Sequence, residues 1–234
     1  RFLKTVVDVT GNLVCCFKAQ KAFFDVLPDG KTILKEVIQY IHTHHPEKPV
    51  LVDCKIGDIE NTMGAYIQVL FDQIQADGIV VNPYMGTDVL EPLQEYPDKS
   101  IVVLVKTSNP GGDCFQDVPL LGGDPYWMHV LKTISSWKLP NLVPVLSANT
   151  SYDLSGCREI IGNQTPVLLA GVGSQGGSVN KLGEILNDDD AGVFVNSSRS
   201  ILYPTYSEAE ISWENAIREA AYQLNANLES VRRR

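Results

Sequence analysis

Residues 49–81 read PVLVDCKIGDIENTMGAYIQVLFDQIQADGIVV, and the order of apolar and polar residues in this stretch predicts the fold. The apolar run Pro49–Val52 lacks clean alternation, which is typical of a strand buried on both faces of a sheet. A segment with helical period follows at Asn61–Gln75, and a second apolar run, Gly78–Val81, ends the stretch. Strand, helix and strand in this order predict two parallel strands joined by a right-handed crossover.

The same alternation of strand and helix extends along the whole chain. Seven apolar runs predict strands at Leu13–Phe17, Pro49–Val52, Gly78–Val81, Ile101–Val105, Leu142–Leu146, Val167–Ala170 and Gly192–Val195. Segments with helical period occur at Lys31–His44, Asn61–Gln75, Tyr126–Ser136, Tyr152–Ile161, Val179–Leu186 and Glu208–Val231. Because no linker or shift in composition divides the chain, residues 1–234 are predicted to form a single α/β domain.

A closed barrel of this class, the (β/α)8 TIM barrel, has eight strands, one more than these runs supply. Residues Arg1–Thr10 have instead the pattern of a helix that ends at Gly11-Asn12. We therefore expect a TIM barrel whose first strand lies upstream of residue 1, which would make the domain N-terminally incomplete. An open seven-stranded sheet is the alternative.

The composition excludes several classes of function. A net charge of −9 argues against a nucleic-acid partner, because binding the phosphate backbone requires a basic face. No apolar run approaches the ~20 residues of a membrane span, and the N-terminus lacks the layout of a signal peptide. We expect a cytoplasmic protein with no membrane partner, with an organellar signal outside this stretch as the alternative. The five cysteines lack metal-site or disulfide spacing, which predicts reduced thiols.

Polar residues follow the predicted strands at the ends where a barrel of this class builds its active site. The sharpest cluster follows Pro49–Val52, where Asp53 and Lys55 lie two residues apart and so point to the same side of a strand. Lys18, which follows the preceding strand, can bring a second ammonium group to them. Such an array holds a lysine protonated and oriented for proton delivery. A buried ion-pair network that ties the strands together explains the spacing equally well.

A second set of residues predicts a phosphate site. The glycine-rich segment Gly171-Val-Gly-Ser-Gln-Gly-Gly177 is followed one strand later by Asn196-Ser-Ser-Arg199. Barrels of this class bind phosphate near these last strands. Backbone N–H groups and a bidentate guanidinium suit a phosphate dianion. The pairing of the glycine-rich turn with Arg199 therefore indicates a phosphorylated substrate.

Together these residues resemble a known family. Val52-Asp-Cys-Lys-Ile-Gly-Asp-Ile59 is similar to the D-x-K-x-x-D-I signature of orotidine 5′-phosphate decarboxylases. Further segments resemble the branch typical of many bacteria and some protists: Phe17-Lys-Ala-Gln20 with Ala22-Phe-Phe24, Asn82-Pro-Tyr-Met-Gly-Thr-Asp88, Lys106-Thr-Ser-Asn-Pro110, Gly171-Val-Gly-Ser-Gln-Gly-Gly177 and Asn196-Ser-Ser-Arg199. The similarity runs in order over nearly the whole chain.

The resemblance implies an activity that needs no cofactor and no metal: removal of CO2 from orotidine 5′-monophosphate to give uridine 5′-monophosphate, the last step of de novo pyrimidine synthesis. The implied catalytic residues are Lys18, Asp53, Lys55 and Asp58, with Lys55 as the proton donor to C6 of the ring. The implied substrate-binding residues are Thr62, Ser108, Asn149, Gln175, Gly176, Gly177 and Arg199. Asp58 and Thr62 would be shared across the interface of a homodimer. The domain could also be fused to orotate phosphoribosyltransferase, as in a bifunctional uridine monophosphate synthase.

Two departures from the family pattern are visible. The ribose-binding aspartate that members carry after the first strand has no counterpart here, which fits a first strand upstream of residue 1. Cys54 and Ile56 occupy positions often held by alanine and arginine. Two alternatives are a Mg²⁺-dependent sugar-phosphate lyase with the same D-x-K-x-x-D spacing and a non-catalytic phosphate-binding barrel.

Overall fold

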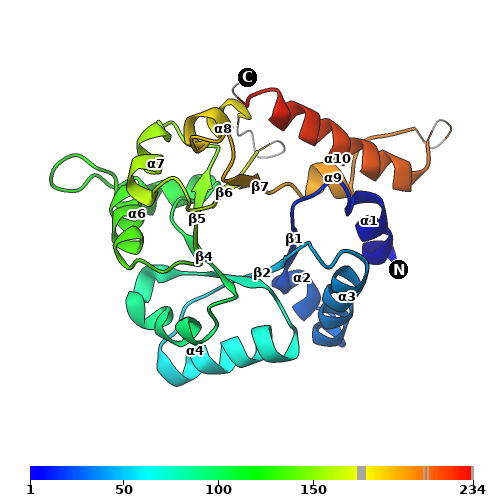
Figure 1. Ribbon diagram of the computed structural model, residues 1–234, viewed down its shortest axis with the longest axis horizontal. Helices are drawn as coiled ribbons and strands as arrows, with labels where there is room; N and C mark the ends of the chain where they lie inside the picture. The colour runs from blue at the N-terminus through cyan, green and yellow to red at the C-terminus, as the bar shows by residue number, and fades with distance from the viewer. Residues whose placement is uncertain (173–177, 208, 210, 233–234) are drawn as a thin grey trace. The chain divides into compact units, whose positions relative to one another are not determined.

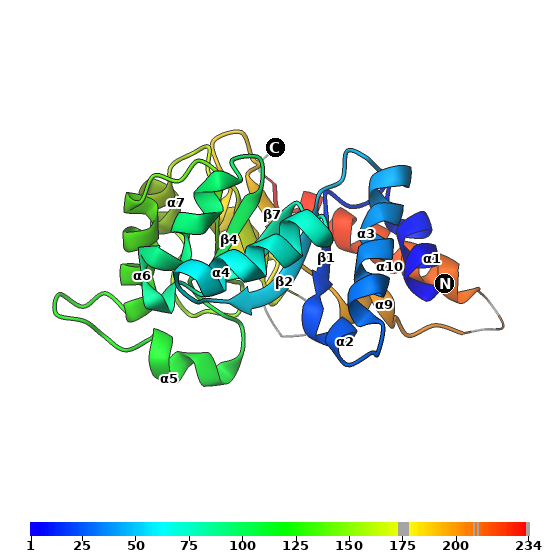
Figure 2. The same ribbon diagram turned by 90° about the horizontal axis from the view of Figure 1, so that it is seen from below.

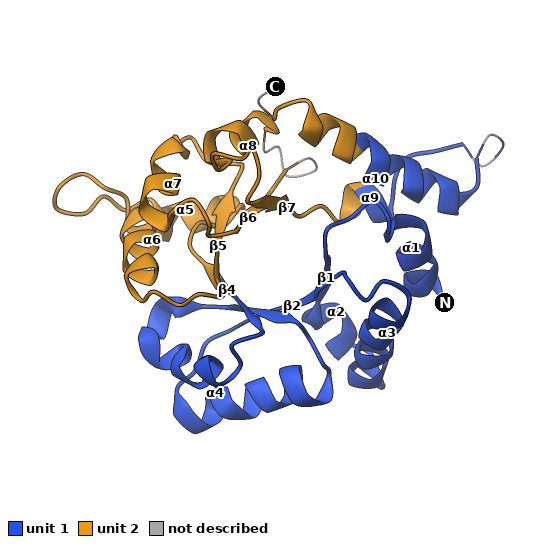
Figure 3. Ribbon diagram, in the orientation of Figure 1, with its two compact units in different colours: residues 1–102, 201–223 blue, residues 103–200, 224–234 orange. Residues whose placement is uncertain are grey.

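The computed structural model describes residues 1–172, 178–207, 209 and 211–232. The chain divides into two compact units (Figure 3). Unit 1 contains residues 1–102 and 201–223, and unit 2 contains residues 103–200 and 224–234. The expectation of a single domain over residues 1–234 stays a prediction.

Neighbouring strands follow the order of the chain, β1-β2-β3-β4-β5-β6-β7, and the boundary between the units falls within β4. The pairs β1–β2, β2–β3, β5–β6 and β6–β7 are parallel, as the sequence predicts. The strands are β1 (Phe17–Gln20), β2 (Val50–Ile56), β3 (Gly78–Val81), β4 (Ser100–Leu104), β5 (Leu142–Ser147), β6 (Val167–Ala170) and β7 (Val193–Val195). The described residues thus form an α/β fold with parallel strands in sequence order. The eighth strand of a closed barrel stays an expectation.

Helices separate the strands in both units. The α-helices are α1 (Phe2–Thr10), α2 (Lys21–Asp25), α3 (Gly30–His44), α4 (Glu60–Ile67), α5 (Asp113–Gln116), α6 (Tyr126–Ser136), α7 (Ser155–Ile161), α8 (Asn180–Ile185), α9 (Arg199–Leu202) and α10 (Trp213–Glu229). Shorter helical segments are η1 (Gln68–Gln73), η2 (Pro83–Met85), η3 (Thr87–Val89), η4 (Glu91–Glu95) and η5 (Pro110–Gly112). None of the helices in the described part of the chain combines the length and apolar composition that crossing a bilayer requires.

In unit 1, amphipathic helices cover the strands. Helix α3 buries Leu34, Ile38 and Ile41, whose spacing places them on one helical face. Helix α1 lies beside α3 (Figures 1 and 2). At the end of α1, a Cβ on Gly11 would lie only 2.2 Å from the His45 ring, so any larger residue there would displace that ring. The core of the unit therefore contains these helical residues and the buried residues of β2 and β3.

In unit 2, the strands β5 and β6 are almost completely buried. Helices α6, α7 and α8 follow one another along one side of these strands (Figure 1). Trp127 of α6 is fully buried and packs edge-on against Tyr152.

The first predicted strand differs most from the structure. The apolar run Leu13–Phe17 was expected to be the strand, whereas β1 begins at Phe17 and continues through Lys18 to Gln20. Leu13 lies in a turn instead, with its N–H bonded to the Thr10 carbonyl. The strand is therefore the more polar part of the segment, because Phe17–Gln20 are the residues that pair in parallel with Val50–Asp53.

Candidate active site

The ends of β1 and β2 bring Lys18, Asp53 and Lys55 together, and we call these three residues the charged triad. Lys18 is paired with Leu51 and Gln20 with Asp53 in the β1–β2 register. Lys18 Nζ lies 2.8 Å from Asp53 Oδ2, and Lys55 Nζ lies 2.7 Å from Asp53 Oδ1. One carboxylate therefore binds two ammonium groups, one on each oxygen.

The backbone at Lys55 is irregular. The register between β2 and β3 shifts between Val52 and Ile56, so the triad residues of β2 lie in a bulge. Lys55 has a φ of +46°, a left-handed conformation that non-glycine residues rarely adopt. The sequence argument assumed a regular strand with Asp53 and Lys55 on one side. The side chains do meet, but through this bulge rather than through simple alternation.

Burial and the neighbouring charges have opposite effects on the pKa of Asp53. Burial alone would raise the pKa of the Asp53 carboxyl, but Lys18 and then Lys55 outweigh it and hold the pKa below its ordinary value. The Asp53 side chain is 9% exposed, whereas that of Lys55 is 45% exposed. The triad therefore contains a buried carboxylate and one ammonium group that can reach a bound molecule.

Gly57 allows the end of β2 to approach the end of β3. A Cβ on Gly57 would lie 2.5 Å from the carbonyl oxygen of Asn82. The Asn82 N–H in turn donates to the Ile56 carbonyl at 2.7 Å. This close contact fixes the backbone just beyond Lys55.

Asp58 and Thr62 lie apart from the triad contacts. The Asp58 carboxylate accepts the N–H of Ile59 at 2.9 Å, and among the described residues it forms no ion pair with the triad. Thr62 is exposed in the first turn of α4. Their assignment to a shared dimer interface stays a prediction.

In unit 2, the loops after β4 and β5 bring Ser108 and Asn149 together. The Asn149 side-chain amide donates to the Ser108 carbonyl at 3.4 Å. The Asn149 N–H also donates to Ser147 Oγ at 3.0 Å, which fixes the loop just after β5. These two predicted substrate-binding residues are therefore neighbours.

The predicted phosphate site is described in part. Arg199 is exposed at the first position of α9, and the described residues give it no salt-bridge partner. Gln175, Gly176 and Gly177 lie outside the described residues. The phosphate site stays a prediction.

A charged cluster near Ser108 was missed by the sequence analysis. Lys106 is 1% exposed and lies 2.7 Å from Asp113 Oδ1 and 2.8 Å from Asp117 Oδ1. Lys106 lies before the loop and the two aspartates lie at the ends of α5, so the contact depends on how the loop folds back and no local signal marks it.

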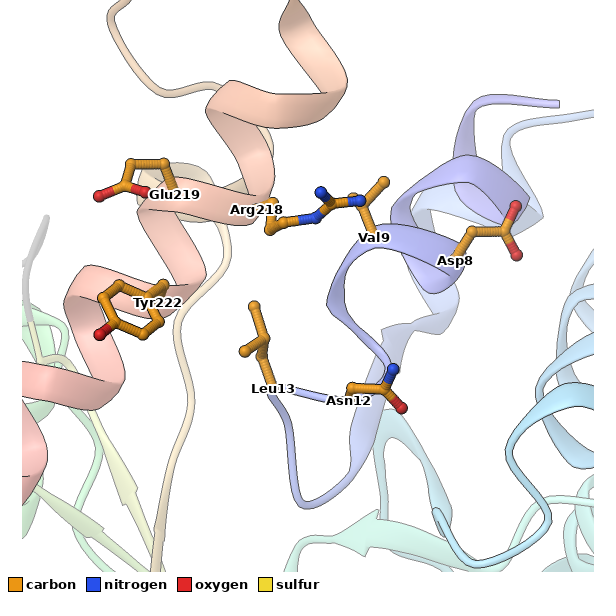
Figure 4. Close-up of a pocket in the computed structure, with 7 residues that line it drawn as sticks. All are labelled: Asp8, Val9, Asn12, Leu13, Arg218, Glu219 and Tyr222. Atoms are coloured by element: carbon orange, nitrogen blue, oxygen red, sulfur yellow. The ribbon is translucent and has the colours of Figure 1, made fainter.

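A pocket of about 430 Å³ lies elsewhere in unit 1 (Figure 4). It is lined by residues at the end of α1, just after it and on α10: Asp8, Val9, Asn12, Leu13, Arg218, Glu219 and Tyr222. Because Asn12 and Leu13 precede β1, the pocket is on the N-terminal side of that strand, where barrels seldom place catalytic groups. None of the predicted site residues lines it, so we do not regard it as the candidate site.

Among the described residues, no group of three or more histidine, cysteine, aspartate or glutamate side chains is placed to hold a metal ion. The expectation of a reaction without metal or cofactor stays a prediction.

Comparison with known proteins identifies close relatives. The model of the "Orotidine 5'-phosphate decarboxylase / HUMPS family" matches residues 1–202. A curated relative from Aromatoleum aromaticum is 38% identical over 224 residues, covering 94% of this chain and 81% of its own length. A relative from Bordetella pertussis is 35% identical over 235 residues, covering 99% of this chain and 85% of its own length. Both are named orotidine 5′-phosphate decarboxylase.

Solved structures show the same similarity. Leishmania donovani OMP decarboxylase has a TM-score of 0.85 and 28% identity, covering 99% of this chain and 86% of the other. Leishmania donovani UMP synthase has a TM-score of 0.87 and 29% identity. This match covers 99% of the present chain but only 49% of the synthase chain, so the chain spans about half the length of that protein.

Proposed function

Because the chain belongs to the orotidine 5′-phosphate decarboxylase / HUMPS family, we propose that it removes CO2 from orotidine 5′-monophosphate to give uridine 5′-monophosphate. The family description covers more than one group, and the named relatives distinguish them. The two relatives described above, at 38% and 35% identity over nearly the full chain, are both named orotidine 5′-phosphate decarboxylase. No finding favours the Mg²⁺-dependent sugar-phosphate lyase or the non-catalytic barrel.

The observation that carries the proposal is the Asp53 carboxylate between the ammonium groups of Lys18 and Lys55. In the proposed reaction, the bond between C6 and the carboxylate carbon breaks, CO2 leaves and the electron pair stays on C6. Lys55 Nζ then donates a proton to C6. Preorganised positive charge from the two lysines stabilises the developing carbanion before the proton is transferred.

Asp53 has two roles in this mechanism. It orients both ammonium groups through contacts of 2.7 and 2.8 Å. In the proposed complex, its negative charge would lie near the substrate carboxylate that departs. Because the pKa of Asp53 is held below its ordinary value, the group remains a carboxylate at neutral pH. The two lysines therefore keep their counter-charge throughout the reaction.

The remaining predicted residues would bind the substrate. Ser108, which is held by Asn149, is proposed to contact the pyrimidine ring. Gln175 would bridge ring and phosphate, and Arg199 with Gly176 and Gly177 would bind the phosphate. Binding energy from the phosphate can be used to exclude water from the ring.

We further propose a homodimer that shares Asp58 and Thr62. Exposed apolar side chains support it, since they follow the ends of two strands in unit 1. Phe23 and Val26 follow β1 and are 76% and 78% exposed, and Tyr84 follows β3 and is 70% exposed. Large apolar side chains exposed near a site are typical of an interface with another chain.

Three further points belong to the proposal. The complete fold would be the eight-stranded TIM barrel, the protein would be cytoplasmic, and the domain could be joined to orotate phosphoribosyltransferase. The similarity to one half of the Leishmania donovani UMP synthase chain supports such a fusion.

The test follows the ultraviolet absorbance of orotidine 5′-monophosphate with a metal chelator present. We expect metal-independent loss of substrate in the wild type and none in Lys55→Ala. Lys132→Ala is the matched control, because Lys132 is an exposed lysine on α6 that pairs with Asp124. No activity in a folded wild type, or full activity in Lys55→Ala, would contradict the proposal.

A further inference from the structure

Lys106 is a buried lysine at the C-terminal end of β4. Its side chain is 1% exposed, and its N–H donates to the Val145 carbonyl of β5 at 3.0 Å. Burying an ammonium group is costly unless charged partners satisfy it. Asp113 and Asp117 do so, at 2.7 and 2.8 Å from Nζ.

The balance of burial and charge keeps Lys106 ionised. Burial alone would lower its pKa, but the contacts with Asp113 and Asp117 outweigh it and raise the pKa above the ordinary lysine value. Asp113 belongs to α5, and Asp117 follows that helix directly. The ammonium group therefore ties the strand end to both ends of α5 at every physiological pH.

The loop between Lys106 and α5 is closed by further contacts. The Thr107 N–H donates to Gln116 Oε1 at 2.9 Å, and Gln116 Nε2 donates to Thr107 Oγ1 at 2.8 Å. The Thr107 hydroxyl also donates to Asn109 Oδ1 at 2.7 Å. Ser108 lies between these two anchored residues, so its position depends on the whole set.

A structural role alone would not require a charge here. Replacing a buried ion pair by apolar residues of similar volume is often neutral or stabilising. Three charged partners specify one arrangement of the loop, whereas apolar packing would not. Because Asp113 is 60% exposed and Asp117 is 25% exposed, the pairs contribute more to geometry than to stability.

We infer that Lys106 is a positioning residue which, through Asp113 and Asp117, holds Ser108 against the pyrimidine ring of the substrate. The inference rests on the proposed function, since it concerns the ring of the same substrate. Lys106 is too buried to contact the substrate itself. Its loss should therefore weaken recognition of the ring and leave recognition of the phosphate unchanged.

The experiment compares Lys106→Met with wild type, using two competitive ligands. Uridine 5′-monophosphate carries the pyrimidine ring, and ribose 5-phosphate does not. We expect the inhibition constant for uridine 5′-monophosphate and the KM for orotidine 5′-monophosphate to rise about tenfold, the effect of losing one or two hydrogen bonds. The inhibition constant for ribose 5-phosphate should change less than about twofold. Lys106→Arg, which retains the charge, should recover most of the loss.

Equal weakening of both ligands, or no change for either in the folded variant, would overturn the inference. If Lys106→Met does not fold, Asp113→Asn tests the same contact at an exposed position, and Thr107→Val tests the contact between Thr107 and Gln116. Inactivity of the wild type would instead refute the proposed function. The two failures are therefore distinguishable.

Discussion

Replacing Asp53 with asparagine removes the charge shared by Lys18 and Lys55 and leaves the size of the side chain unchanged. A hydrogen bond to a charged group contributes about 1.5–3 kcal/mol when it is buried. The Lys18 contact qualifies, because its side chain is 14% exposed. The Lys55 contact is screened by solvent and contributes about 0.5–1 kcal/mol. We therefore expect Asp53→Asn to lower the free energy of unfolding by about 2–4 kcal/mol.

The effect on catalysis should be larger than the effect on folding. Without the carboxylate, the two ammonium groups repel each other and lose their common orientation. Loss of one preorganised electrostatic group reduces kcat by about 10²–10³-fold, and we expect at least this reduction. Urea unfolding measures the first effect, and the ultraviolet decarboxylation assay measures the second.

Asp98→Asn is the matched control for this substitution. Asp98 is a 75% exposed aspartate that lies 3.9 Å from Lys99, so its loss should change stability by less than about 0.5 kcal/mol. If Asp53→Asn lost stability but kept its kcat, the charged triad would be only an ion-pair network that ties β1 to β2. An unchanged stability would show that the two contacts carry no net energy. The first result would refute the mechanism built on Asp53, and the second would refute the energy assigned to its two contacts.

Three other predictions follow from the site and its surroundings. If Asp58 is shared across a dimer, mixing Lys55→Ala and Asp58→Ala subunits should restore about one quarter of wild-type activity. Half of the dimers are then mixed, and each mixed dimer has one intact site out of two. No recovery after verified subunit exchange would show that Asp58 acts in the site of its own subunit. Because the folded pKa of Asp53 is lowered, its stabilisation is present above the ordinary aspartate pKa and is lost as the pH falls through the folded value. The stability difference between wild type and Asp53→Asn should then shrink in urea titrations below about pH 4, and a difference that grew in acid would contradict the pKa direction. The contact with Cys16 lowers the pKa of exposed Cys15 to about 6, whereas burial raises that of Cys54 to about 11. Mass spectrometry after iodoacetamide treatment at pH 7 should therefore find Cys15 alkylated before Cys54, and the reverse order would be inconsistent with these environments.

The sequence predicts elements best where burial is continuous. Gly78–Val81, Val167–Ala170 and Tyr126–Ser136 agree with the structure to the residue. Each is set by apolar side chains that pack on a core, which is the property that hydrophobic pattern measures. The hydrophobic pattern is therefore sufficient to predict the bounds of elements like these.

Prediction is weaker where a strand continues into polar residues. The strand β2 runs on to Ile56, four residues beyond the predicted run Pro49–Val52. The strand continues there although Asp53 and Lys55 are charged, with a shift in its register with β3 between Val52 and Ile56. The helix expected at Asn61–Gln75 is an α-helix only to Ile67 and then a π-helical segment, a change in hydrogen bonding that residue types do not reveal.

The sequence predicts which side chains of the charged triad pair, but it does not predict the backbone conformation at which they meet. The contacts of Asp53 with Lys18 and Lys55 follow from strand order and residue type. The left-handed conformation of Lys55 does not, because lysine gives no signal for a positive φ. The contacts of Lys106 depend on how a loop folds back, and such long-range contacts have no local pattern.

Because of the left-handed backbone at Lys55, selection for stability and selection for activity should favour different residues at this position. A non-glycine residue in this conformation costs about 1–2 kcal/mol, which glycine would not incur. A variant library sorted only for heat resistance should therefore enrich glycine at position 55, whereas a library grown without external pyrimidine should retain lysine. Position 55 can thus serve as a marker that distinguishes a gene copy maintained for its chemistry from one that is drifting into an inert folded protein.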